Sequence, residues 1–93
     1  RARTKGLLGR DGLDGAIVLS PARSVHTLRM RFPIDVAFLD GDGRVLHTCT
    51  LRPNRFSRVV WKARSVVEAE AGSFERWRLA VGDVVEIRAG ESS

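Results

Sequence analysis

The sequence contains a single cysteine, Cys49, among its 93 residues. One cysteine excludes an intramolecular disulfide framework and any metal site built only from thiolates. The simplest interpretation of Cys49 is a buried thiol, because free cysteine packs like a small apolar side chain. A catalytic thiol is the less favoured alternative, since nothing near Cys49 in the sequence would stabilise its thiolate.

Long apolar runs are also missing. The run Ala16–Leu19 is far shorter than the roughly 20 residues that a membrane-spanning helix needs, so we expect a soluble domain. No internal repeat and no linker rich in Pro, Ser or Gly divides the chain. A length of 93 residues therefore predicts one domain, covering residues 1–93, and the sequence sets neither its localisation nor its oligomeric state.

Glycine-rich phosphate loops and calcium loops are absent as well, and the sequence Asp40-Gly41-Asp42-Gly43 is typical of a turn. It separates two extended patterns, Ile34–Leu39 and Arg44–Leu51, and so predicts a β-hairpin. Alternation along the second arm predicts that one face is the more buried. That face would carry Val45, His47, Cys49 and Leu51.

Further strands are predicted over residues 16–20, 65–69 and 84–88. A short helix is predicted over Ser73–Leu79, capped by Ser73 and stopped by Gly82, and Thr4–Arg10 could form another helical turn. The fold class is therefore mostly β: a small antiparallel barrel-like or strongly curved sheet with one or two short helices. The predicted core comprises Ile17, Leu19, Ile34, Val36, Phe38, Val45, Val67, Phe74, Val85 and Ile87.

A histidine and a carboxylate, His26 and Asp35, lie nine residues apart around Pro33. If the chain bends at the proline so that the two side chains meet, the carboxylate would orient the imidazole for general base chemistry. Ser24 or Thr27 would then be the nearest nucleophile. The alternative is structural, because buried polar groups usually serve to satisfy backbone hydrogen bonds.

The stretch Ser24-Val25-His26-Thr27, followed by Met30 and by Phe32-Pro33-Ile34-Asp35-Val36, resembles the domain of unknown function 192 family, also called uncharacterised protein family 0127. The resemblance extends to Gly6-Leu7-Leu8-Gly9-Arg10, Ala71-Gly72 and Val81-Gly82-Asp83. It implies a small antiparallel barrel-like domain found in bacteria and archaea, with no established activity. The positions that match the family pattern are His26, Thr27, Met30, Pro33, Asp35, Gly72 and Gly82. Many members carry cysteine where this chain has Ala22, so a thiol nucleophile cannot occupy that position here.

Acidic residues are absent from residues 52–64, which carry five cations and two aromatic rings. Arginine and lysine can hold phosphates while aromatic rings stack on bases, so this segment is a candidate polyanion-binding surface. The candidate residues are Arg52, Arg55, Arg58, Trp61 and Lys62. The wider charge distribution agrees, because residues 1–64 carry 13 Lys or Arg against 5 Asp or Glu, and residues 65–93 carry 3 against 6.

Three functions remain open. The first is a binding module for a small anionic ligand or an acidic partner around His26 and Asp35, with Thr27 and Arg10 as further candidates. The second is weak polyanion or nucleic-acid binding through residues 52–64, and the third is a small hydrolase-like enzyme that uses His26 and Asp35. We expect no cofactor. His47 and Cys49 could form a zinc site with His26 and Asp35, but the usual paired-cysteine or His-x-x-x-His spacing is absent, so we expect no metal.

Overall fold

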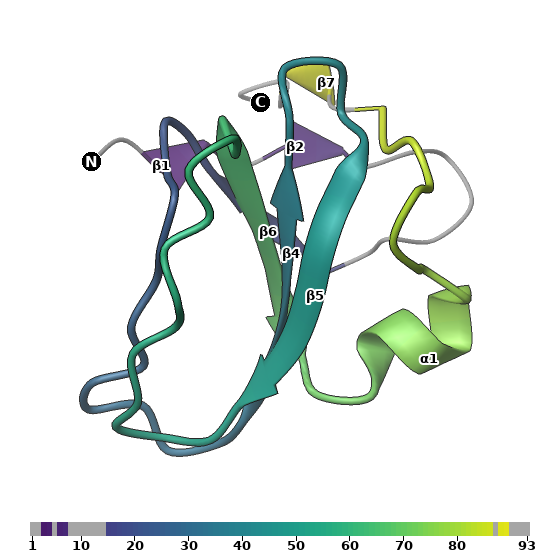
Figure 1. Cartoon of the computed structure of the whole chain (residues 1–93). Helices are drawn as coiled ribbons and strands as arrows, with labels where there is room; N and C mark the ends of the chain where they lie inside the picture. The colour runs from purple at the N-terminus through teal and green to yellow at the C-terminus, as the bar shows by residue number, and fades with distance from the viewer. Residues whose placement is uncertain (1–2, 5, 8–14, 87, 90–93) are drawn as a thin grey trace.

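The computed structural model describes residues 3–4, 6–7, 15–86 and 88–89. Within them the chain forms a five-stranded antiparallel sheet in the order β1-β3-β6-β4-β5, which curves but does not close into a barrel (Figure 1). A second sheet pairs β2 with β7. The strands are β1 (Arg3–Thr4), β2 (Gly6–Leu7), β3 (Ile17–Leu19), β4 (Ile34–Leu39), β5 (Val45–Leu51), β6 (Ser65–Glu70) and β7 (Arg88–Ala89). The mostly β prediction is confirmed, in its curved-sheet form.

The predicted hairpin is present as β4 and β5. Its turn is closed by the Gly43 amide, which donates to the Asp40 carbonyl oxygen over 3.0 Å, and Gly43 has a φ of 83° that favours glycine. The Asp40 carboxylate accepts backbone hydrogen bonds from Arg44 and Asp42, and these bonds lower the pKa of Asp40. The turn is therefore fixed by hydrogen bonds between residues that are close together in the sequence.

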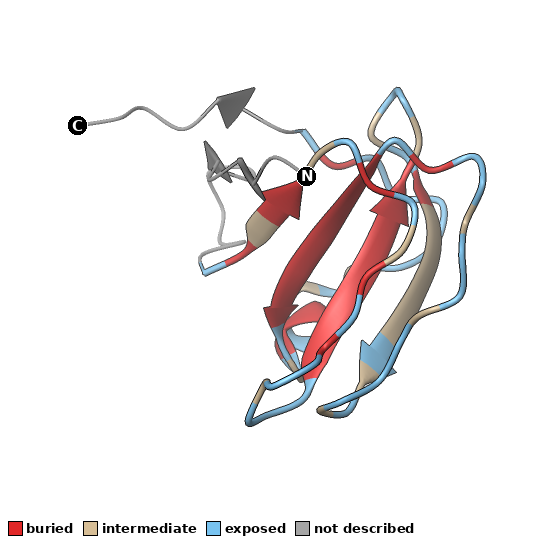
Figure 2. Ribbon diagram, turned by 90° about the vertical axis from the view of Figure 1, so that its left-hand side faces the viewer, coloured by how far each residue is buried: buried red, intermediate tan, exposed pale blue. Residues whose placement is uncertain are grey.

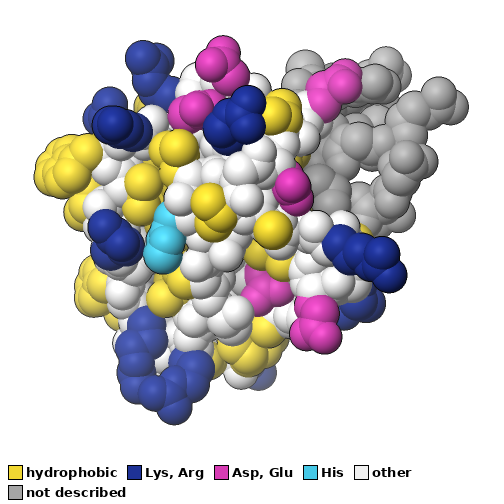
Figure 3. Space-filling view, turned by 45° about the vertical axis from the view of Figure 1, so that its right-hand side comes forward, with side chains coloured by type: hydrophobic (Ala, Val, Ile, Leu, Met, Phe, Trp, Pro, Cys, Tyr) yellow, Lys and Arg dark blue, Asp and Glu magenta, His cyan; other side chains and the backbone are white. Residues whose placement is uncertain are grey.

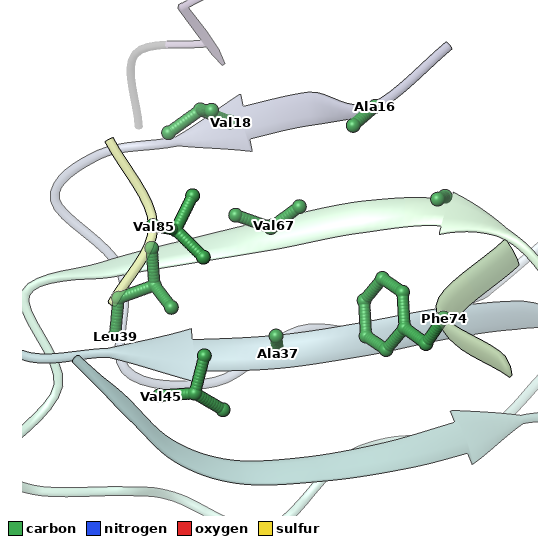
Figure 4. Packing of buried hydrophobic residues seen from close by; sticks show 9 residues of the cluster. Ala16, Val18, Ala37, Leu39, Val45, Val67, Phe74 and Val85 are labelled. Atoms are coloured by element: carbon green, nitrogen blue, oxygen red, sulfur yellow. The ribbon is translucent and has the colours of Figure 1, made fainter. Parts of the chain in front are cut away.

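The predicted alternation along β5 is wrong at Val45. Val45 pairs with Leu39 whereas His47 pairs with Phe38, so Leu46 is an extra residue that forms a bulge. A bulge of one residue reverses the face to which the preceding side chain points. Figure 4 shows the result, with the side chains of Val45 and Leu39 on the same side of the sheet.

Two hydrophobic clusters cover the two faces of the sheet. One contains Ala37, Leu39, Val67, Phe74 and Val85, and lies between the sheet and the segments after β6 (Figure 4). The opposite cluster comprises Leu19, Ala22, Val25, Ile34, Val36, Phe38, Ala63 and Val66. Figure 2 shows β4 buried along its whole length and the edge strand β5 mostly half-buried. The predicted core is confirmed except that Ile17 is half-buried, and Ile87 lies outside the described residues.

The helix α1 (Ser73–Trp77) is shorter than predicted. Ser73 is its first residue rather than its cap, and Gly72 precedes it with a φ of 95° and no capping side chain of its own. The helix ends at Trp77, well before Gly82, because Arg78 takes a left-handed conformation. The predicted face is correct, since the rings of Phe74 and Trp77 lie 5.9 Å apart.

Both ends of the chain also differ from prediction. Thr4 lies in β1 and Gly6–Leu7 form β2, so this part of the expected helical turn is extended, and residues 8–10 lie outside the described residues. The strand expected over residues 84–88 is reduced to a single bridge between Val84 and Arg44, and β7 begins at Arg88.

Candidate functional site

Asp35 lies in β4 on the face that is covered by α1. One carboxylate oxygen, Oδ2, accepts hydrogen bonds from the backbone amides of Gly72 at 2.9 Å and Phe74 at 3.1 Å. The other oxygen accepts a hydrogen bond from the Thr50 hydroxyl at 2.7 Å. The residue is 5% exposed. Asp35 therefore supplies from a neighbouring strand the helix cap that Ser73 was expected to supply, and it ties β4, β5 and α1 together.

His26 lies on the other side of the sheet. Its side chain is exposed, its Nδ1 accepts a hydrogen bond from the Leu28 amide at 3.3 Å, and its ring lies 6.0 Å from that of Phe56. Because side chains alternate along β4, Ile34 and Val36 face the cluster that contains Val25, whereas Asp35 faces α1. The structure does not bring His26 and Asp35 together, and the carboxylate does not orient the imidazole.

Thr27, next to His26, is completely buried. Its hydroxyl accepts a hydrogen bond from the Arg55 amide at 2.9 Å and donates to the Arg52 carbonyl oxygen at 2.6 Å. Its own amide donates to the Arg55 carbonyl oxygen, and its carbonyl oxygen accepts from Asn54 and Met30. These contacts make Thr27 a clamp between two loops. Arg10, the other candidate around His26, lies outside the described residues.

The two loops that Thr27 joins are residues 20–33 and residues 52–64, which we call the basic loop layer. They run side by side over the sheet face opposite α1 (Figure 1). Backbone hydrogen bonds join Ala22 to Arg64, Arg23 to Val60 and Val25 to Ser57, and an antiparallel bridge joins His26 to Phe56. The loops are thus held in register although neither is a regular strand.

The basic loop layer carries three arginines in residues 20–33 and five cations in residues 52–64, with no Asp or Glu in either loop. All five candidates of the second loop are exposed, and Trp61 is 77% exposed. Figure 3 shows hydrophobic and Lys or Arg side chains alternating along the left-hand margin of that view, and the Asp and Glu side chains lie elsewhere. Residues 20–33 were not among the predicted binding residues, although the absence of acidic residues there is visible in the sequence.

A small cavity lies beside Asp35 and the start of α1. It has a volume of about 210 Å³ and is lined by Asp35, Thr48, Cys49, Thr50, Gly72, Phe74 and Glu75. Burial raises the pKa of the Cys49 thiol, and the negative charge of Asp35 raises it further. This environment disfavours the thiolate that nucleophilic chemistry or metal binding would need. Among the described residues, no three His, Cys, Asp or Glu side chains come together as a metal site.

Comparison of the sequence with known proteins identifies a family. The family model of DUF192, described as an uncharacterised ACR, matches residues 1–87. The chain belongs to the DUF192 family. A protein from Pyrococcus furiosus named UPF0127 protein PF1050 is 40% identical over 63 residues, which make up 68% of this chain and 54% of that relative. The match thus spans about half of the relative's length, and no solved structure matches the chain.

Two of the positions that match the DUF192 pattern meet in the structure, because the Asp35 carboxylate holds the Gly72 amide. Thr27, another such position, holds the two loops of the basic loop layer together. Each of these contacts joins segments that are far apart in the sequence. In the part of the chain that the structure describes, no helix is both long and apolar enough to cross a bilayer.

Proposed function

We propose that this DUF192 domain is a binding module for an anionic partner and that the basic loop layer is its binding surface. The observation that carries the proposal is the pairing of two loops that together hold eight cations and no acidic residue. Within these two loops no carboxylate offsets the positive charge, and a surface of this kind attracts anions. Seven of the eight cations are arginines, whose planar guanidinium groups hold phosphate or carboxylate in bidentate fashion.

The cations of the second loop are available for a ligand. The side chains of Arg52, Arg58 and Lys62 are exposed and form no hydrogen bond or ion pair with any described residue. Their backbone is nevertheless held, because the Thr27 hydroxyl and the amides of the first loop anchor it. A surface that is already ordered loses little conformational entropy when a partner binds.

The same geometry argues against a ligand site that uses His26 and Asp35 jointly. His26 belongs to the basic loop layer, where it bridges to Phe56. Asp35 lies on the opposite face with all three of its hydrogen bonds inside the protein. A hydrolase that needs this pair as a general base would have to move a side chain through the sheet.

Binding to an immobilised polyanion such as heparin tests the proposal, with affinity measured as a function of salt. We expect log K to fall linearly with log salt, and the slope to lessen by roughly two when Arg52 and Arg58 are both changed to Gln. The matched control changes Arg76 and Arg78 to Gln, which removes the same charge from α1 and the residue after it. If the two double variants lose binding equally, net charge rather than the basic loop layer is responsible, and the proposal is wrong.

A further inference from the structure

The basic loop layer also exposes large apolar side chains. Five of them are at least 40% exposed: Leu28, Phe32, Phe56, Val59 and Trp61. Each stands next to a cation in the sequence, in the pairs Leu28-Arg29, Arg31-Phe32, Arg55-Phe56, Arg58-Val59 and Trp61-Lys62. Single exposed apolar residues are common on protein surfaces, but five on one pair of loops indicate an interaction site.

These side chains are not needed to build the core. The inner side of the same loops already supplies Ala22, Val25 and Ala63 to the buried cluster over the sheet, with Met30 and Val60 packed against it. The five exposed side chains belong to the outer side of the layer. Several large apolar side chains gathered on one exposed surface mark an interaction site.

We infer that the basic loop layer docks on the surface of an anionic lipid bilayer, an inference that rests on the proposed function. Cations next to apolar side chains suit this boundary, because the cations meet lipid phosphates while the apolar groups enter the interfacial region. Tryptophan is enriched at that depth. The binding is peripheral and needs no membrane-spanning segment.

Two of the five side chains favour lipid over a single-stranded nucleic acid. Leu28 and Val59 are aliphatic and offer no ring on which a base could stack. In a bilayer they are as effective as aromatic side chains, because the free energy of burial depends on the apolar area. A nucleic-acid surface would use the rings of Phe56 and Trp61 and leave these two side chains in water.

The charge distribution would also orient the domain on such a surface. Residues 65–86, which form β6, α1 and the segment after them, carry five acidic residues against two arginines. The helix lies over the opposite face of the sheet from the basic loop layer. An anionic bilayer would therefore attract the loops and repel the helix side.

The test uses vesicles of phosphatidylcholine alone and vesicles that contain about one third phosphatidylglycerol. Trp61 serves as the reporter in a Trp77→Phe background, since the chain has only two tryptophans and Trp77 packs in the protein. We expect the emission of the exposed Trp61 to shift to shorter wavelength with the anionic vesicles and to stay unchanged with the neutral ones.

The decisive variant changes Leu28 and Val59 to Ser, which alters neither charge nor aromatic rings. We expect it to bind anionic vesicles roughly tenfold more weakly and heparin with unchanged affinity. The matched control changes Val81 and Val84, which are 60% and 59% exposed, to Ser and should bind vesicles like the parent. Circular dichroism melting of both variants checks that the fold is kept.

The outcomes separate the two proposals. If the protein binds heparin and a single-stranded oligonucleotide but not anionic vesicles, the lipid inference is wrong and the anion-binding function stands. If the Leu28 and Val59 variant loses oligonucleotide and vesicle binding alike, the lipid inference is also wrong. If nothing anionic binds, both proposals fail together.

Discussion

Replacing Asp35 should show how much of the stability depends on one buried carboxylate. The carboxylate accepts three hydrogen bonds, two from backbone amides at the start of α1 and one from Thr50. A hydrogen bond to a charged group contributes about 1.5–3 kcal/mol, but three on one carboxylate are not additive, because burial of the charge costs desolvation energy. We therefore expect Asp35→Ala to lower the free energy of unfolding by roughly 3–4 kcal/mol.

Such a loss is large for a domain of this size. At about 0.05–0.15 kcal/mol per residue, 93 residues provide roughly 5–14 kcal/mol in total. Asp35→Asn should cost only about 1 kcal/mol, because an amide oxygen can accept both backbone bonds while the NH₂ group donates to the Thr50 hydroxyl. Thr50→Val removes one of the three bonds and should cost about 1 kcal/mol.

Urea denaturation followed by circular dichroism measures these differences, and the slopes must agree among the variants for the comparison to hold. We expect the largest loss of stability for Asp35→Ala and smaller losses for Asp35→Asn and Thr50→Val, because the first removes three hydrogen bonds and the others at most one. An Asp35→Ala protein within about 1 kcal/mol of the parent would refute the argument that this carboxylate caps the helix. Equal losses for Asn and Ala would show that the charge, rather than the hydrogen-bond geometry, matters.

Two further predictions concern the hairpin. Gly43→Ala should destabilise the protein by at least about 2 kcal/mol, because the residue has positive φ and its new Cβ would press against the Val85 carbonyl oxygen, whereas Gly41→Ala should be nearly neutral by the same denaturation assay. Cys49 should react with iodoacetamide more slowly than a free thiol at pH 8, with the rate rising only at higher pH, because its raised pKa keeps it protonated. A Gly41 variant as unstable as the Gly43 variant would contradict the first explanation. A fast reaction of Cys49 at neutral pH would contradict the second.

The parts of the fold that could be predicted from the sequence are those fixed by neighbouring residues. The hairpin follows from Asp40 and Gly43, which close the turn within a few residues. The face of Val45 was mispredicted because a bulge is set by cross-strand pairing, which strict alternation ignores. The sequence predicts Ser73 as the cap of α1 for a similar reason, since the residue that caps the helix, Asp35, lies 37 residues before Gly72 in the sequence.

The candidate site could likewise be predicted only where it depends on residues that are neighbours in the sequence. The basic segment was recognised because a run of cations is visible along the chain, whereas its pairing with residues 20–33 depends on contacts such as Thr27 to Arg55, which are 28 residues apart. The proximity of His26 and Asp35 could not be judged from their spacing, because alternation along β4 decides which face a carboxylate takes. Only the register of the sheet shows that the two lie on opposite sides.

The backbone pairing of the two loops has a consequence for how the surface can change. The bonds from Ala22 to Arg64 and from Arg23 to Val60 run between main-chain atoms, so they do not depend on which side chains the outer positions carry. Positions 28, 56, 58 and 61 can therefore be substituted with little effect on the scaffold, while an insertion in one loop would break its register with the other. The outer side chains of the two loops can thus vary one residue at a time, provided that the lengths of both loops stay fixed.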